Sequence, residues 1–286
     1  MKINEIKINI GAEKPFQILH FSDNHLTFAD SRDCERKISL GESRSRSFLN
    51  KSGCKTQAEH LDEMLAYAKE NNLTIVHTGD MIDFVSKANL DYVKNVLEGH
   101  DYFMAAGNHE YSQFVGEAWE DENYKHQSFD AVCAAYPGDI WYQVRMIGGI
   151  KFIAIDNNYY YITEKQFRRF REDTADGVPV VLVVHNPIYS PDTYNVVMDG
   201  VSNTVPPYLF GCPELLLREL EDHRYRQQKP DDLTSAFVEF CEKLPNLKCI
   251  LAGHLHKYSE SKLISGVPQY VAGAGYNGEA NLYTFI

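Results

Sequence analysis

Seven side chains of the types that bind metal ions follow apolar runs of the sequence, at positions far apart along the chain. These residues are Asp23, His25, Asp80, Asn108, His185, His254 and His256. Two segments supply a pair of them, as Asp-x-His at 23–25 and His-x-His at 254–256. Because residues two apart at the end of a strand point to the same side of the chain, each pair can direct two donor atoms to one point.

These residues offer enough donor atoms for two metal ions, provided that one carboxylate is shared. Mixed imidazole and oxygen donors suit first-row ions such as Mn, Fe, Zn, Co or Ni rather than Ca. A single Asp or His after a strand is typical of a turn, a helix N-cap or a structural histidine. Five such strand ends in one chain are difficult to explain in that way, so the pattern predicts a site with two divalent or transition metal ions.

Short apolar runs of the kind found in strands buried on both faces precede these residues. The predicted strands are 16–23, 73–80, 102–109, 151–158, 178–186, 247–254 and 269–275. The predicted helices are 56–70, 163–173 and 232–244. Capping-box sequences open the first two helices, at Thr56…Glu59 and Thr163…Gln166. Strands that alternate with helices predict an α/β fold, in which ligands collect at the carboxyl edge of the sheet.

A hairpin over residues 140–155 that turns at Gly148-Gly149 indicates a mixed sheet, and 279–286 reads as a final strand. Two long segments, 26–55 and 186–231, look irregular, which is typical of lids, binding loops or disorder. The sequence "GAGYNG" at 273–278 spells a dinucleotide-binding motif. No room for a helix and another strand follows it, so we expect these glycines only to turn the chain near the metal site.

Composition limits the classes of partner. The chain has 286 residues with 44% hydrophobic and 24% charged residues, as in a soluble globular protein. Its net charge of −12 argues against nucleic acid or an anionic membrane as a general partner. No apolar run approaches the roughly 18 residues of a membrane span, and the N-terminus lacks a signal sequence. Together with six scattered cysteines, expected to be free thiols, these features predict a cytoplasmic protein.

The order of the motifs resembles the calcineurin-like metallophosphoesterases. The motifs are Asp-x-His, Gly-Asp-x-x-Asp, Gly-Asn-His-Glu, His and Gly-x-His-x-His, and they extend from about residue 16 to 257. The matching residues are Asp23, His25, Gly79 to Asp83, Gly107 to Glu110, His185 and Gly253 to His256. The resemblance implies one α/β domain over residues 1–286, a four-layer αββα sandwich of two mixed sheets flanked by helices.

The resemblance also implies a role for each matching residue. One metal would be held by Asp23, His25, Asp80 and His256. The other would be held by Asp80, Asn108, His185 and His254. Asp80 and a water or hydroxide would then bridge the two metals. His109 would be a catalytic group near the phosphate, while Asp83 and Glu110 would orient loops or ligand histidines.

The function implied is metal-dependent hydrolysis of a small phosphomonoester or phosphodiester. A metal pair lowers the pKa of a bridging water, and His109 could protonate the leaving alkoxide as imidazolium or, alternatively, position the phosphate. A protein phosphatase or a nuclease of the same family is the alternative, although a nuclease is expected to be basic. A non-catalytic scaffold should have lost ligands or His109, whereas this chain has them all.

The two irregular segments carry the candidate substrate contacts. Arg44 or Arg46 could bind a substrate phosphate if residues 31–55 form a lid rather than a solvated loop. Aromatic residues in 186–231 could shape a specificity pocket or simply pack over the sheet edge. They are Tyr189, Tyr194, Tyr208 and Phe210. The tyrosine run 159–161 is interpreted as surface or sheet packing, with the alternative that it lines a cleft. The sequence leaves the substrate, the choice of metals and the oligomeric state open.

Overall fold

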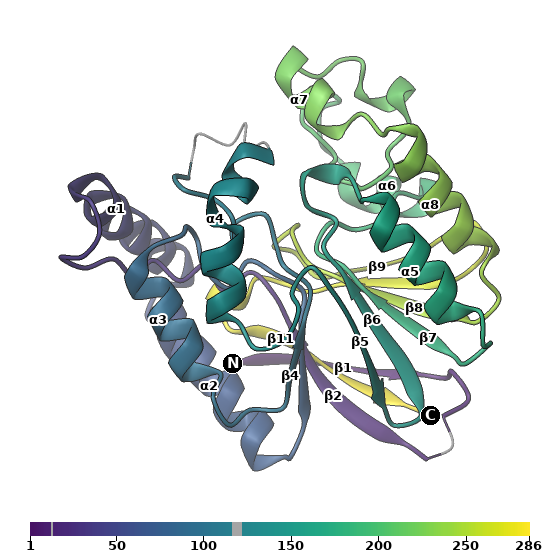
Figure 1. Cartoon of the computed structure of the whole chain (residues 1–286), viewed down its shortest axis with the longest axis horizontal. Coiled ribbons are helices and arrows are strands. Elements are labelled where there is room, and N and C mark those ends of the chain that lie inside the picture. Colours follow the sequence, from purple (N-terminus) through teal and green to yellow (C-terminus); the bar gives the residue numbers. More distant parts are fainter. Residues whose placement is uncertain (13, 116–121) are drawn as a thin grey trace.

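Two β-sheets packed face to face form the centre of the fold, and helices cover both outer faces (Figure 1). The computed structural model describes residues 1–12, 14–115 and 122–286. The first sheet is mixed, with one antiparallel pair between β11 and β2. Across this sheet the strands are β1 (Lys2–Ile8), β11 (Glu279–Phe285), β2 (Phe16–Phe21), β3 (Thr74–His77) and β4 (Tyr102–Met104).

The second sheet is also mixed, with antiparallel pairs at its two edges and parallel pairs between them. Its strands, in order, are β5 (Tyr142–Ile147), β6 (Ile150–Ile155), β7 (Val180–Val183), β8 (Leu247–Ala252), β10 (Pro268–Val271) and β9 (Ser259–Lys262). The hairpin between β5 and β6 turns at Gly148-Gly149, as the sequence predicts. Both glycines have positive φ, the conformation that a two-residue hairpin turn requires.

Helices form the two outer layers. Those near the first sheet are α1 (Glu35–Ser52), α2 (Gln57–Glu70), α3 (Lys87–Val96) and α4 (Glu122–Ala135). Those near the second sheet are α5 (Glu164–Thr174), α6 (Pro191–Met198), α7 (Asp222–Gln228) and α8 (Asp232–Lys243). Three single turns of 3-10 helix are η1 (Asn158–Tyr160), η2 (Glu214–Leu217) and η3 (Gly275–Asn277). No helix in the described ranges is both long and apolar enough to cross a bilayer.

Side chains alternate between two cores along each central strand. On β7, Val181 and Val183 point into the core between the sheets, whereas Val180 and Leu182 face the helices. Phe170 of α5 and Phe237 of α8 pack on that outer face. This burial on both faces explains why the strands read as continuous apolar runs in the sequence. The four-layer αββα sandwich with two mixed sheets is therefore confirmed.

The expectation that residues 26–55 are irregular is wrong. Most of this segment is α1, an 18-residue helix that ends at Gly53 in the left-handed conformation. Only Gly41 and Phe48 of α1 are buried, so its apolar stripe is too narrow to produce a clear helical period. The segment 186–231 is more irregular but contains α6 and α7.

The chain near "GAGYNG" behaves as expected. Residues 275–277 form η3, and β11 follows directly. The ring centroid of Tyr276 lies 5.4 Å from that of His256, so this turn does bring the chain close to the candidate ligands. Two edge strands, β1 and β9, have no counterpart among the predicted elements. The exposed positions of β1 are polar, and β9 contains no apolar residue, so neither gives an apolar run in the sequence.

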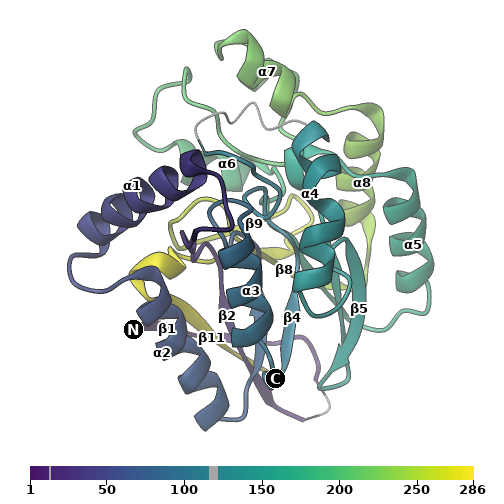
Figure 2. The ribbon, with the colours of Figure 1, turned by 60° about the vertical axis from the view of Figure 1, so that its left-hand side comes forward.

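Figures 1 and 2 show both termini in the lower half of the molecule and α7 at its upper end. The carboxyl ends of β2 and β3 in one sheet meet those of β7 and β8 in the other at the seam between the sheets. Backbone hydrogen bonds join these ends within each sheet, from Asp23 N to the Gly79 carbonyl (2.9 Å) and from Gly253 N to the His185 carbonyl (3.0 Å). The segments that carry the candidate ligands are thereby held in one place.

Candidate metal centre

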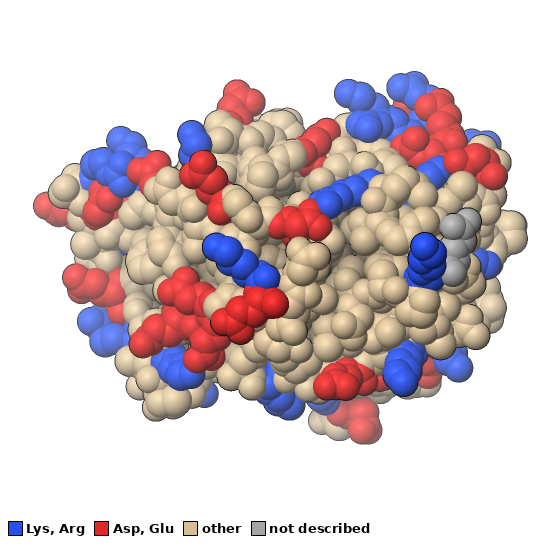
Figure 3. Space-filling model, turned by 90° about the horizontal axis from the view of Figure 1, so that it is seen from below, with Lys and Arg blue, Asp and Glu red and all other residues tan. Residues whose placement is uncertain are grey.

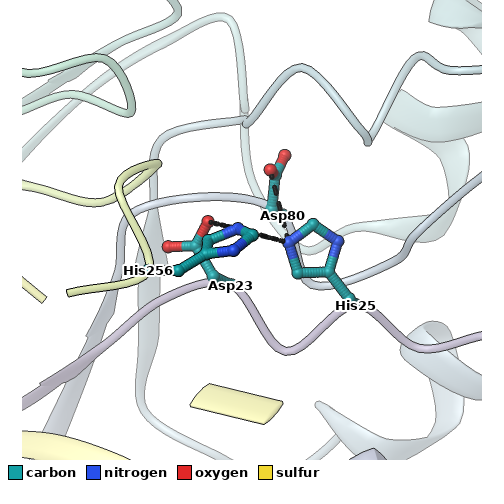
Figure 4. Close-up of side chains that lie close together, drawn as sticks. All are labelled: Asp23, His25, Asp80 and His256. Atoms are coloured by element: carbon teal, nitrogen blue, oxygen red, sulfur yellow. Dashed lines mark hydrogen bonds and ion pairs between the residues drawn. The ribbon is translucent and has the colours of Figure 1, made fainter. Parts of the chain in front are cut away.

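Four potential metal ligands from both sheets meet at this seam (Figure 4). We call Asp23, His25, Asp80 and His256 the first cluster. The Nε2 atom of His256 lies 3.2 Å from Asp23 Oδ1 and 2.9 Å from His25 Nε2. The His25 Nε2 atom lies 3.8 Å from a carboxylate oxygen of Asp23 and 3.8 Å from one of Asp80. One donor atom from each residue lies within 4.8 Å of the others, so the cluster could hold a metal ion.

Asp80 also belongs to a second cluster, with His185 and His254. The His185 Nε2 atom lies 3.2 Å from Asp80 Oδ2 and 3.2 Å from Asn108 Oδ1. The His254 Nδ1 atom lies 3.1 Å from His185 Nε2. The same oxygen, Asp80 Oδ2, faces His25 in the first cluster and His185 in the second. The two His/Asp clusters are therefore consistent with a dinuclear metal site that shares one carboxylate.

Hydrogen bonds from the Nδ1 atoms of His25 and His185 orient the Nε2 atoms of these rings toward the clusters. His25 Nδ1 lies 2.9 Å from Asp83 Oδ1, and His185 Nδ1 lies 2.6 Å from the Thr78 carbonyl oxygen. These oxygens accept hydrogen bonds, so each Nδ1 carries a proton and each Nε2 is the ring nitrogen that faces the cluster. Asp23 Oδ1 is buried and accepts no hydrogen bond from the described residues. A metal ion is a partner that would satisfy this oxygen.

Tyr160 completes the second cluster from a place that the sequence analysis assigned to packing. Its hydroxyl lies 2.9 Å from His254 Nε2, which leaves Nδ1 of the same ring to face His185. Tyr160 is buried in η1, which follows β6, and Asn157 just before η1 accepts a hydrogen bond from the His185 backbone N–H (3.2 Å). The polar run that follows β6 resembles the other ligand-bearing strand ends, and that signal could have identified Asn157, but it does not reveal that the Tyr160 hydroxyl points to His254.

Left-handed backbone conformation is concentrated at the site. Five candidate ligands have positive φ, namely Asp23 (58°), His25 (51°), Asp80 (58°), His254 (73°) and His256 (54°). The other described non-glycine residues of this kind are Asn72, Tyr159, Tyr160 and Tyr208. The left-handed region costs an L-residue about 1–2 kcal/mol, and such strain persists only where the surroundings enforce it. The sharp turns that this conformation gives bring side chains from separate strands to one point.

Two glycines of the motifs are required by close approach. A Cβ atom at Gly107 would lie 2.1 Å from Asp80 Oδ1 and 2.3 Å from Asp80 N. A Cβ atom at Gly253 would lie 2.0 Å from Ser22 Oγ and 2.9 Å from Asp23 Oδ2. Any side chain at these positions would displace a carboxylate of the first cluster. The glycines therefore define the geometry of the site although they provide no donor atom.

Glu110 holds the loop that carries Asp80. Its buried carboxylate accepts hydrogen bonds from the backbone N–H groups of Gly107 (2.6 Å), Asp80 (2.7 Å) and Met81 (2.8 Å). The Tyr136 hydroxyl donates a further hydrogen bond at 2.9 Å. Burial and the nearby charge of Asp80 raise the pKa of Glu110. The carboxylate thus has an orienting role at the start of the Asp80 turn.

In the clusters, burial and close pairing of opposite charges shift the pKa of each group in opposite directions. Burial would raise the pKa of Asp23 and Asp80, but the nearby imidazoles of His256 and His185 hold both well below the usual range. Burial would lower the pKa of His25, yet its contacts with Asp23 and other carboxylates raise it to about 10. Burial lowers the pKa of His254 to about 3. The pairing keeps both carboxylates in the ionised form, which is the form that binds a cation.

His109 lies beside the clusters and not within them. Its backbone N–H donates to Asp80 Oδ1 (2.8 Å), and its ring Nδ1 donates to the Asp83 carbonyl oxygen (2.7 Å). Because Nδ1 is engaged in this way, Nε2 is the ring nitrogen left to act on a bound molecule. The side chain is 17% exposed and lines the cavity described below.

Arg44 and Arg46 occupy very different positions on α1. Arg44 forms a two-point pair with buried Asp83, through Nε (2.6 Å) and a terminal nitrogen (2.7 Å). The central carbon of its planar guanidinium group lies 4.8 Å from the centre of the Phe48 ring. Arg46 is 71% exposed and lies 4.0 Å from Glu42 on the same helix. Only Arg44 is thus connected to the clusters, through the carboxylate that orients His25.

A cavity of about 490 Å³ opens over the clusters. Asp80, Asn108, His109, His254 and His256 line one end of it. The other end is lined by α6, α7 and the segment between them. This volume is in the range typical of sites for small molecules.

The four aromatic residues predicted for this region separate into two groups. Tyr208 lines the cavity, with its ring centroid 5.5 Å from that of His254. Phe210 is fully buried in the core under α8, and Tyr189 and Tyr194 pack around Leu209. The prediction of an aromatic pocket wall therefore describes Tyr208, whereas the alternative of packing describes the other three.

Comparison with solved structures finds similar folds at low identity. A dimetal phosphatase from Danio rerio has 12% identity and a TM-score of 0.50, over 92% of this chain and 88% of that one. The phosphopantetheinyl hydrolase from Mycobacterium tuberculosis has 11% identity and a TM-score of 0.39, over 95% and 91%. A 5'-nucleotidase from Candida albicans has 15% identity and a TM-score of 0.41, over 96% and 47%. Comparison with curated proteins gives no match.

The family assignment rests on a match that includes all the motifs. The family model of the calcineurin-like phosphoesterases matches residues 16–258, which contain every residue of both clusters. The two mixed sheets and their flanking helices form the αββα sandwich of this family, and the fold is similar to that of the Danio rerio phosphatase. The chain is therefore a phosphoesterase hydrolase and belongs to the calcineurin-like phosphoesterase family.

Proposed function

We propose that this enzyme hydrolyses a small phosphate ester with two metal ions held at the seam of the sheets. Asp23, His25, Asp80 and His256 would hold one ion. Asp80, Asn108, His185 and His254 would hold the other. The single observation that supports this assignment best is that Asp80 Oδ2 faces histidines of both clusters. Mn, Fe, Zn, Co or Ni would suit these donors.

When bound, such a pair of ions supplies an activated water and positive charge for the phosphoryl oxygens. The side chains of the protein would place the phosphate, give a proton to the leaving group and orient the ligand histidines. Asp80 and Asn108 line the end of the cavity where a phosphate would lie. His109, with its Nδ1 bonded to the Asp83 carbonyl, would present Nε2 to the leaving-group oxygen and give it a proton. The contact between Asp83 and His25 would keep that imidazole oriented.

A small ester fits the cavity better than a macromolecule does. The clusters lie at one end of a cavity that extends toward α6 and α7. The chain as a whole carries a net charge of −12, and Figure 3 shows basic and acidic side chains interspersed on the face seen from below. A nuclease needs a basic track for the backbone of its substrate. We therefore favour a small ester over a nucleic acid or a protein.

Assays with p-nitrophenyl phosphate and bis-p-nitrophenyl phosphate test this proposal. We expect turnover of at least one of them by Mn-loaded protein, because either ester places a phosphoryl group at the clusters. Removal of metal with a chelator should abolish turnover, and readdition of Mn should restore it. Release of p-nitrophenolate is the measurement. Full activity after exhaustive chelation, or no turnover of either ester with metal bound, would overturn the proposal.

Replacement of His109 separates catalysis from metal binding. His109→Ala should lower kcat by about 10²–10⁴-fold, because a general acid contributes that much, while the metal content stays unchanged. His126→Ala, at an exposed position of α4, is the matched control and should retain wild-type kcat. The measurements are steady-state kinetics and elemental analysis. Loss of metal from His109→Ala would show that its role is misassigned.

Replacement of the two arginines of α1 tests which one serves the site. Arg44→Ala should lower activity by about 10- to 100-fold, because Asp83 then loses the partner that holds it beside His25. Arg46→Ala should change activity less than twofold, since that side chain points into solvent. Both kcat and KM are measured on the same ester. Equal effects of the two substitutions would contradict the role given to Arg44.

A further inference from the structure

The part of the cavity away from the clusters has an apolar wall that metal binding does not explain. Val196, Val197 and Met198 contribute to it from α6, and Val201 and Val205 from the segment that follows. Val201 and Val205 are 40% and 42% exposed, respectively, although they are aliphatic. Solvent-exposed aliphatic side chains that share the wall of one cavity are typical of a binding site.

The apolar wall begins directly beside the candidate ligands. Leu255 lies between His254 and His256 in the chain and lines the same cavity. Tyr208 places its ring 5.5 Å from the ring of His254, and its left-handed backbone (φ 55°) is fixed by a hydrogen bond from its N–H to the Gln228 side chain (3.0 Å). A molecule with its phosphate on the clusters would therefore have its organic part against these side chains.

We propose that this wall is a subsite for the leaving group, and that the substrate is the phosphate monoester of a hydrophobic alcohol. The inference rests on the proposed function, because the clusters must hold the phosphate for the wall to meet the rest of the ester. Hydrolysis at the clusters would add water across the P–O bond. The products are inorganic phosphate and the apolar alcohol, with the proton delivered to the alkoxide oxygen.

Two features of the cavity support a monoester of this kind. The candidate ligands and His109 line one end of it, so a substituent of the phosphorus can extend toward α6 and α7 at the other end. The side chains contributed by α6 and the segment after it are mainly aliphatic, whereas α7 contributes Arg224 and Gln227, and the rings of Tyr159, Tyr160 and Tyr208 also line the cavity. A polar alcohol such as glycerol would lose hydration against the aliphatic side chains of α6 and the segment after it.

A homologous series of n-alkyl monophosphates, from ethyl to octyl, tests the inference with Mn-loaded full-length protein. The leaving-group pKa hardly changes along the series, so kcat/KM reports contacts with the chain. Each methylene buried is worth about 0.8 kcal/mol, which is about a fourfold gain in kcat/KM. We expect a steady rise until the wall is covered, and glycerol phosphate should be cleaved no better than ethyl phosphate.

Matched variants locate the effect. The double substitution Val201→Ser and Val205→Ser should reduce the gain to less than twofold per methylene. Both positions are partly exposed, so the fold should tolerate the change. Val144→Ser is the control, because Val144 is 38% exposed on edge strand β5 and should leave the gain unchanged. Circular dichroism verifies that each variant is folded.

The outcomes distinguish this inference from the proposed function. Turnover of p-nitrophenyl phosphate with no dependence on alkyl chain length would overturn the hydrophobic subsite and leave the phosphoesterase site intact. A dependence on chain length that persists in the double variant would also overturn it. If no ester in either assay is cleaved by metal-loaded protein, the proposed function fails first.

Discussion

Two buried carboxylates at the seam of the sheets, Asp23 and Asp80, are the constraint on which the rest of the site depends. Both side chains are almost completely buried, and an isolated buried carboxylate is strongly unfavourable. Four histidines that follow three different strands lie close to them, and a backbone N–H group donates a hydrogen bond to one oxygen of each carboxylate. One cation in each cluster would balance the charge of the buried carboxylates, which is consistent with a dinuclear centre.

The same constraint explains features of the backbone that otherwise look costly. Asp23 Oδ2 accepts a hydrogen bond from the His254 backbone N–H (3.0 Å), which connects the end of β2 to the end of β8. Asp80 Oδ1 accepts one from His109 N–H, which connects the ends of β3 and β4. Each carboxylate therefore has a structural oxygen and another oxygen directed at the histidines. Left-handed turns and close glycines at Gly107 and Gly253 allow this arrangement.

Much of the candidate site could be predicted from the sequence because its residues follow strands that are buried on both faces. The apolar runs before Asp23, Asp80, His185 and His254 identify β2, β3, β7 and β8, and carboxyl ends of such strands share an edge. Long-range contacts were not predictable in this way. Tyr160 reaches His254 from a strand end that carries no histidine, and no local pattern reveals that its hydroxyl points inward.

The helix α1 shows a second limit of what can be predicted from the sequence. Its sequence buries only two residues, so hydrophobic periodicity gives no signal over most of its length. The helix is positioned by tertiary contacts, among them the pair between Arg44 and Asp83 and the packing of Phe48 against the His25 ring, with centroids 5.3 Å apart. An arginine that reads as part of a mobile loop is therefore an element of the site. Only the three-dimensional arrangement separates it from Arg46.

Metal stoichiometry with and without the shared carboxylate tests the central claim most directly. The protein and its Asp80→Asn variant, which keeps the size of the side chain and removes its charge, would be equilibrated with Mn, and bound metal determined by elemental analysis. Asp130→Asn, at an exposed position of α4, serves as the control. The account predicts about two metal ions per wild-type or control chain, and at most one per chain of Asp80→Asn. Two ions bound with unchanged affinity by Asp80→Asn would contradict it.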